Sequence, residues 1–170
     1  KHWSRGLGDV YKRQFFMSEG MKRLSTPWSV ASIRARQIDP MALPAGIILD
    51  AAAGSGIQLI AFSKILKRPA LGVEIDQDVA KLCAANMFLN SEGDVQRSLD
   101  RVLVGDGCSA ESAVSTYWSS LREAGIRAHP PVAMLHIDPA RPRDAQNHSL
   151  DEMEPDIKSV LKGWSSHLQT

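Results

Sequence analysis

Acidic residues with the chemistry to bind a ligand follow four short apolar segments of the chain. These acids are Asp50, Glu74, Asp106 and Asp138. One acid after a strand is common, because Asp favours turns. Four in corresponding positions are more informative, because the carboxyl ends of parallel strands share one edge of a sheet, and open α/β sheets bind ligands there. We therefore expect these four side chains to line a single site.

A small-residue loop, Ala51-Ala52-Ala53-Gly54-Ser55-Gly56, comes directly after Asp50. Gly54 and Gly56 can adopt positive φ and let a ligand approach the backbone. The pattern from Ile57 onward predicts a helix, whose free N–H groups at its start favour an anionic group. Strand, glycine loop and helix together are typical of a nucleotide-type site.

The residues around this loop restrict the kind of ligand. Glu74 lies 20 residues after Gly54, the spacing at which an acid reaches the ribose hydroxyls of a nucleoside. No Gly-Lys-Ser/Thr follows the glycines, so the loop is not a phosphate-binding loop of the Walker type. Leu59 stands where a nicotinamide or flavin site needs a third small residue.

The elements that must position these residues alternate along the chain. Strands are predicted at 47–50, 70–76, 101–105 and 132–137, and helices at about 26–37, 57–67, 77–90, 110–124 and 155–168. In the first helix, Thr26 is the expected N-cap, Pro27 the first helical residue, and Val30 and Ile33 the inner face. Strands that are apolar throughout favour an α/β fold, a Rossmann-like doubly wound parallel sheet. Such sheets normally have more than four strands, so we expect a chain truncated at its C-terminus.

The composition, 44% apolar and 23% charged over 170 residues, is that of one globular domain. No apolar run is long enough to cross a bilayer, and the N-terminus lacks a signal peptide pattern, so a cytoplasmic location without membrane contact is expected. Cys83 and Cys108 are interpreted as reduced thiols. The five histidines share no ligand spacing, so no metal site is predicted.

The N-terminal part of the chain is basic. Residues 1–14 resemble a translated sequencing linker and are left out of the fold. The bases that remain are interpreted as a solvated face or a contact with nucleic acid: Lys22, Arg23, Arg34 and Arg36. We expect a helical extension at 15–46 and a partial cofactor-binding domain at 47–170.

Four motifs resemble those of class I S-adenosylmethionine-dependent methyltransferases. They are Leu49-Asp-Ala-Ala-Ala-Gly-Ser-Gly56, Gly72-Val-Glu-Ile-Asp76, Gly105-Asp-Gly107 and Ile137-Asp-Pro-Ala-Arg141. The resemblance implies S-adenosyl-L-methionine as the cofactor, with Asp50 near its methionyl amino group and Ala52, Gly54 and Gly56 in the loop beneath it. It further implies that Glu74 binds the ribose and Asp106 the adenine amino group.

The fourth motif is the one that should face the methyl acceptor. By the resemblance, Asp138, Pro139 and Arg141 are the candidate catalytic residues, with Asp138 positioning the acceptor. Ala140 and Arg141 replace a second Pro and an aromatic residue that relatives use for exocyclic amines, and Cys108 is not placed for carbon methylation. Arg141 and Arg143 either bind phosphate or pair with nearby acids.

The function expected from this resemblance is methyl transfer from S-adenosylmethionine. The segments around Thr26, the D-P-A-R motif and 149–156 resemble methyltransferases that carry a THUMP-like C-terminal domain, which makes RNA the first choice of acceptor and protein the second. Two rival hypotheses are a non-catalytic or incomplete cofactor-binding fragment and a nicotinamide-dependent oxidoreductase, and Leu59 argues against the latter.

Overall fold

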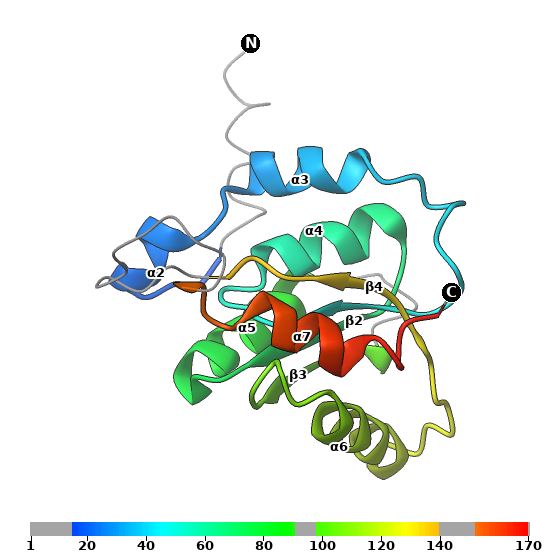
Figure 1. The fold of residues 1–170 in the computed structure, drawn as a ribbon. Helices are drawn as coiled ribbons and strands as arrows, with labels where there is room; N and C mark the ends of the chain where they lie inside the picture. Colours follow the sequence, from blue (N-terminus) through cyan, green and yellow to red (C-terminus); the bar gives the residue numbers. More distant parts are fainter. Residues whose placement is uncertain (1–14, 91–97, 140–151, 170) are drawn as a thin grey trace.

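The computed structural model describes residues 15–90, 98–139 and 152–169. Its centre is a sheet of four parallel strands in the order β3-β2-β1-β4 (Figure 1). The strands are β1 (Ile47–Asp50), β2 (Ala70–Glu74), β3 (Arg101–Val104) and β4 (Val132–His136). The four strands and their parallel pairing, both predicted from the sequence, are confirmed.

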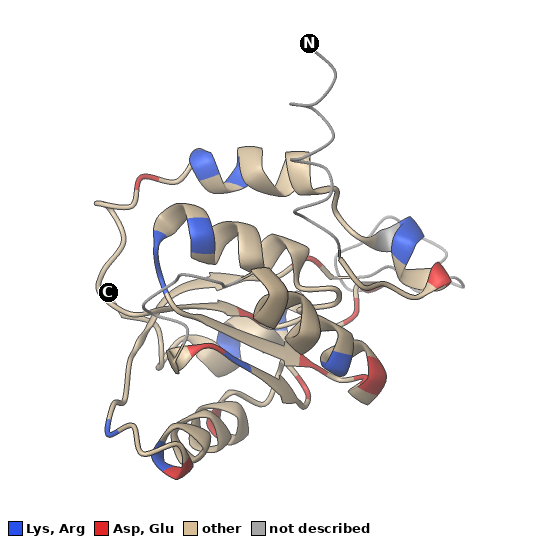
Figure 2. Ribbon diagram, turned by 180° about the vertical axis from the view of Figure 1, so that it is seen from behind, with Lys and Arg blue, Asp and Glu red and all other residues tan. Residues whose placement is uncertain are grey.

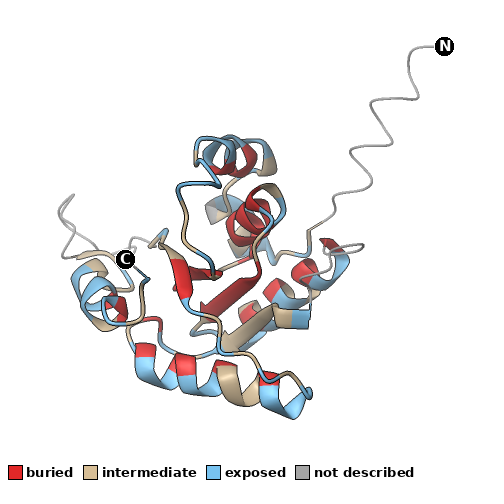
Figure 3. Ribbon diagram, turned by 90° about the vertical axis from the view of Figure 1, so that its right-hand side faces the viewer, coloured by how far each residue is buried: buried red, intermediate tan, exposed pale blue. Residues whose placement is uncertain are grey.

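Strand β1 lies between β2 and β4. Asp50, its last residue, is in register with Gly72 of β2 and with His136 of β4. All four residues of β1 are buried, because helices cover both faces of the sheet (Figure 3). The apolar runs in the sequence arise from this burial on two sides.

The helices form layers on the two faces of the sheet. Helices α4 (Ile57–Leu66) and α5 (Gln77–Asn90) pack on the face that carries Ile48, and α3 (Trp28–Arg36) lies outside α4 (Figure 1). Helices α6 (Ala110–Glu123) and α7 (Ile157–Trp164) pack on the face that carries Leu49. The fold is therefore a doubly wound α/β sheet, as predicted. Within the described residues, no helix is long and apolar enough to cross a bilayer.

Two features of the N-terminal helices differ from the sequence prediction. A short helix that was not predicted, α2 (Glu19–Leu24), precedes α3. In α3, Pro27 is the N-cap and no side chain caps the helix, so the prediction of Thr26 as N-cap is wrong. The predicted inner face is also wrong, because Val30 and Ile33 are exposed.

Helix α3 instead buries its small residues, Ala31, Ser32 and Ala35. Small side chains let two helix backbones approach closely, and α3 packs extensively on α4. A pattern read from large apolar residues cannot detect a contact of this kind.

The last helix, α7, is capped at its start by Asp156, whose carboxylate accepts hydrogen bonds from the N–H groups of Lys158 and Ser159. Val160 and Trp164 are fully buried, whereas Leu161 is half exposed. Leu168 lies beyond the helix and pairs with Val132 as an isolated bridge.

Candidate functional site

The carboxyl edge of the sheet brings the predicted acids together. Figure 2 shows acidic residues along this edge, and the strand order places the change of winding direction between β1 and β4. In doubly wound sheets this is the position where a ligand binds. Asp50 is the buried acid of the group, whereas Asp106 and Asp138 are exposed.

Two carboxylates hold the loop between β1 and α4. Asp50 Oδ1 accepts a hydrogen bond from Ala52 N at 3.1 Å, and Glu74 Oε2 accepts one from Gly54 N at 2.8 Å. Glu74 Oε1 accepts a further bond from Asp76 N at 3.0 Å. Glu74 therefore links the end of β2 to the glycine loop, while its partly buried side chain keeps access to solvent.

The two glycines of the loop have different roles. Gly54 has φ +52°, and the nearest atom to an added Cβ would be Ala52 O at 4.0 Å, so the space beside it is open. Gly56 has φ +78°, and an added Cβ would lie 2.7 Å from Cys83 Sγ of α5. Gly54 thus leaves room for a ligand, and Gly56 allows the loop to pack on α5. No side chain caps α4, so its first N–H groups can serve a bound ligand.

The loop after β3 approaches the loop after β1 very closely. A Cβ on Gly107 would lie 1.9 Å from Ala51 O, so only glycine fits there. Asp106 Oδ1 accepts a hydrogen bond from Cys108 N at 2.9 Å. From the other side, Trp164 Nε1 donates to Gly107 O at 2.7 Å, so α7 fixes the position of this loop.

Asp50 also contacts a histidine that the sequence analysis did not select. His136, the last residue of β4, places Nδ1 3.1 Å from Asp50 Oδ2. Its ring lies against Phe62 of α4, with ring centroids 5.0 Å apart. Asp50 is 2% exposed and the His136 side chain 15%. A polar residue in the otherwise apolar segment Val132–His136 was the signal available in the sequence.

The N-terminal segment reaches Asp138, the candidate catalytic residue. Thr26 Oγ1 donates to Asp138 Oδ2 at 3.3 Å, and Arg34 Nη1 lies 3.4 Å from the same oxygen. Arg34 Nη1 is also 3.3 Å from Gln58 Oε1 of α4. Thr26 and Arg34 were not selected as site residues, because the contacts that matter span more than 100 positions of the chain.

Buried Asn86 ties the same N-terminal segment to the glycine loop. Its Nδ2 donates to Phe16 O at 2.9 Å and to Ser55 O at 2.8 Å, and its Oδ1 accepts from Phe16 N. Ser25 Oγ donates to Ser55 Oγ at 3.1 Å. Residues 15–36 therefore contact both the glycine loop and the segment that follows β4.

Apolar side chains beside the acids are exposed. Ile75, directly after Glu74, is 74% exposed, and Val104, the last residue of β3, is also exposed. Asp76 directly precedes α5, and its carboxylate accepts hydrogen bonds from Asp78 N and Val79 N at the start of that helix. Ile75 and Val104 offer an apolar surface of the kind that a flat heterocycle covers.

The fourth motif is only partly within the described residues. Asp138 and Pro139 are described, whereas Ala140, Arg141 and Arg143 lie outside the described ranges. Among the described residues, no group of three or more His, Cys, Asp or Glu side chains could hold a metal ion.

Neither cysteine is suited to act as a nucleophile. Burial, with the charges of Asp50 and Glu74, raises the pKa of the Cys83 thiol far above its usual value. Desolvation and the nearby Asp106 carboxylate raise the pKa of Cys108. Both thiols therefore stay protonated near neutral pH, whereas the thiolate is the reactive form.

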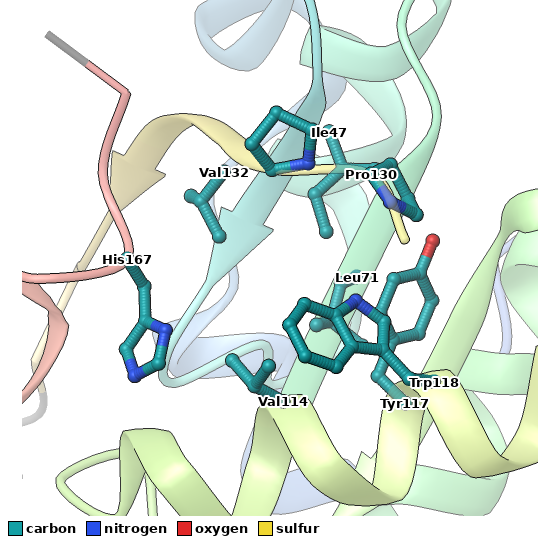
Figure 4. Close-up of a pocket in the computed structure, with 9 residues that line it drawn as sticks. Ile47, Leu71, Val114, Tyr117, Trp118, Pro130, Val132 and His167 are labelled. Atoms are coloured by element: carbon teal, nitrogen blue, oxygen red, sulfur yellow. The ribbon is translucent and has the colours of Figure 1, made fainter. Parts of the chain in front are cut away.

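A small pocket lies at the opposite end of the sheet (Figure 4). It is lined by the first residues of β1 and β4, Ile47 and Val132, and by Trp118 and His167. Its volume of about 20 Å³ holds roughly one water molecule. It is far too small for a nucleoside, so the carboxyl edge remains the candidate site.

Comparison with known proteins identifies the fold. No protein-family model matches the chain, and no curated protein matches it. The structure is similar to the crystal structure of a “putative methyltransferase from Porphyromonas gingivalis W83”, with a TM-score of 0.60 and 18% sequence identity. The match covers 89% of this chain and 32% of that one, so this chain spans about a third of its length. At this identity the similarity shows the fold alone, which is the Rossmann-like doubly wound sheet that the sequence predicted.

Proposed function

We propose that the chain binds S-adenosylmethionine and belongs to an enzyme that transfers its methyl group. The observation that carries the proposal is the Glu74 carboxylate bonded to Gly54 N, beside the open space at Gly54. A carboxylate in this position can accept hydrogen bonds from ribose hydroxyls, and the open backbone beside it leaves room for the nucleoside.

The residues along the edge fit the other parts of this cofactor. Ile75 and Val104 offer apolar surface for the adenine ring, and Asp106 offers an acceptor for its amino group. Asp50 supplies negative charge near the cationic ammonium of the methionyl end, and the uncapped start of α4 suits its carboxylate. The bound cofactor supplies an electrophilic methyl group on a sulfonium.

The protein's contribution to transfer is alignment of the acceptor. Asp138, held by Thr26 and Arg34, is the group we assign to orient it, with Pro139 and Arg141 as its neighbours in the motif. RNA is the proposed acceptor, on the resemblance of the motifs and on the bases of α2 and α3, and protein is the second choice.

Calorimetry tests directly the first part of the proposal, which is cofactor binding. S-adenosylmethionine should bind the chain, and a nicotinamide dinucleotide should not. Transfer of labelled methyl to total RNA or total protein then identifies the acceptor. Binding without transfer to either would favour a non-catalytic cofactor-binding role, whereas binding of the nicotinamide dinucleotide alone would favour an oxidoreductase.

A further inference from the structure

Asp50 and His136 are paired at the position where β1 and β4 end side by side. A buried carboxylate can only accept hydrogen bonds, so Nδ1 of His136 carries a proton toward Asp50 Oδ2, 3.1 Å away. In a neutral imidazole the other nitrogen, Nε2, then has a free lone pair. Within the described residues Nε2 makes no hydrogen bond, and the side chain remains 15% exposed.

We propose that Asp50 and His136 form a proton-accepting dyad, in which Nε2 of His136 takes the proton that the methyl acceptor loses. This proposal rests on the methyl transfer proposed above and makes His136 a catalytic residue. It also specifies the substrate class, which is a neutral acceptor with an N–H or O–H group.

The chemical step is balanced by this assignment. The acceptor nitrogen or oxygen forms a bond to the methyl carbon while the bond from that carbon to sulfur breaks, and its electron pair stays on sulfur. The acceptor proton passes to Nε2. The imidazolium that forms is stabilised by Asp50, which already accepts the Nδ1 proton.

The other candidate bases of the site are less well placed. Asp138 Oδ2 already accepts hydrogen bonds from Thr26 Oγ1 and Arg34 Nη1. Methylation at pyrimidine C5 through a nucleophilic cysteine would need a thiolate, and both thiols stay protonated. His136 and Asp138 lie on the same side of the chain, because Leu135 before them and Ile137 between them pack into the opposite core. The residue that accepts the proton and the residue that orients the acceptor are therefore neighbours.

Among the residues that the structure describes, four charged or titratable groups face this region. They are Asp50 on β1, Asp138 two residues further on, Arg34 of α3, which pairs with Asp138, and Cys83 of α5, whose pKa is raised in part by the charge of Asp50. Helix α4 contributes the uncharged Phe62 and Gln58.

A first test needs no acceptor. Long-range ¹H–¹⁵N NMR spectra of the ¹⁵N-labelled chain, with the His136 signal assigned by its loss in His136→Gln, report which ring nitrogen is protonated. We expect the Nδ1–H tautomer for neutral His136. The Nε2–H tautomer would overturn the proposal, because Nε2 would then have no lone pair to offer.

The second test separates catalysis from binding. His136→Gln should lower the rate of labelled methyl transfer by about 100-fold or more and remove the acid limb of the pH–rate profile, while the Kd for S-adenosylmethionine stays unchanged. His129→Gln, an exposed histidine beside Trp118, is the matched control and should transfer at the normal rate.

The outcomes distinguish the two proposals. An unchanged rate in His136→Gln, or a loss of affinity equal to the loss of rate, would overturn the dyad and leave methyl transfer intact. Failure of the wild-type chain to bind S-adenosylmethionine would instead refute the proposed function, and the dyad with it.

Discussion

Replacing Glu74 with Gln tests the cofactor site at its most informative residue. The carboxylate accepts two backbone hydrogen bonds, from Gly54 N at 2.8 Å and from Asp76 N at 3.0 Å. An amide has one acceptor oxygen, so the variant loses one of these bonds and the negative charge. Because the Glu74 side chain is only partly buried, loss of its hydrogen bond with Gly54 N should lower the unfolding free energy by about 0.5–1.5 kcal/mol.

The expected effect on binding is larger than the effect on stability. A hydrogen bond from a ribose hydroxyl to a charged acceptor is worth about 1.5–3 kcal/mol. Its loss corresponds to a Kd for S-adenosylmethionine that is weaker by roughly 10- to 100-fold. Calorimetry measures this Kd, and urea denaturation measures the unfolding free energy of the same preparation.

Asp76→Asn is the matched control for Glu74→Gln. It removes the same charge two residues away, and Asn caps the start of α5 as well as Asp does. We expect its affinity for the cofactor to equal that of the wild type. Equal losses of cofactor affinity in both variants would mean that affinity depends only on the overall charge of this edge of the sheet. Wild-type affinity in Glu74→Gln would refute the ribose assignment.

Three further perturbations test the framework around the site. Gly107→Ala places a Cβ 1.9 Å from Ala51 O, so the unfolding free energy measured by urea denaturation should fall by about 1–3 kcal/mol. Gly105→Ala is the control, because its Cβ would meet nothing closer than 3.8 Å. Its unfolding free energy should fall by less than about 1 kcal/mol. Arg34→Gln breaks a half-exposed ion pair with Asp138, so the unfolding free energy should change by less than about 1 kcal/mol. The rate of methyl transfer should fall while the affinity for the cofactor stays unchanged. A large loss of stability would contradict the assignment of Arg34 to the site. Burial raises the pKa of Cys83, so its thiol loses a proton more readily in the unfolded chain. The unfolding free energy should therefore be unaffected below the ordinary thiol pKa of about 8.5 and should fall as pH rises above it. Urea denaturation at neutral and at alkaline pH measures this fall, which should be smaller in Cys83→Ala.

The sequence predicted the sheet well because a strand buried on both faces must be apolar along its whole length. Ile47–Asp50 and Ala70–Glu74 follow this rule and end in acids at the carboxyl edge. The same pattern selected Asp50, Gly54 and Glu74 as candidate cofactor contacts, and the structure brings them together because they belong to two consecutive strand–loop units.

The part of the site proposed to face the acceptor depends on contacts that no local pattern records. Thr26 was interpreted as a helix cap, yet its hydroxyl bonds to Asp138. His136 lies within a buried strand, where a histidine can equally be a packed core residue. Helix α3 was assigned the wrong inner face because Ala31 and Ala35, rather than Val30 and Ile33, pack on α4. Each of these outcomes was decided by tertiary structure.

The central place of β1 in the sheet also has a consequence for how the candidate site forms during synthesis. Its neighbour β2 follows after a single helix, so strands β1, β2 and β3 can assemble through connections close in sequence. The other neighbour, β4, brings His136 to Asp50 across 86 positions of the chain. Contacts between distant segments carry a higher entropic cost of loop closure and tend to form late. The part of the candidate site around Asp50 and Glu74 can therefore take shape while the chain is still being made, whereas the part around His136 and Asp138 must wait for β4.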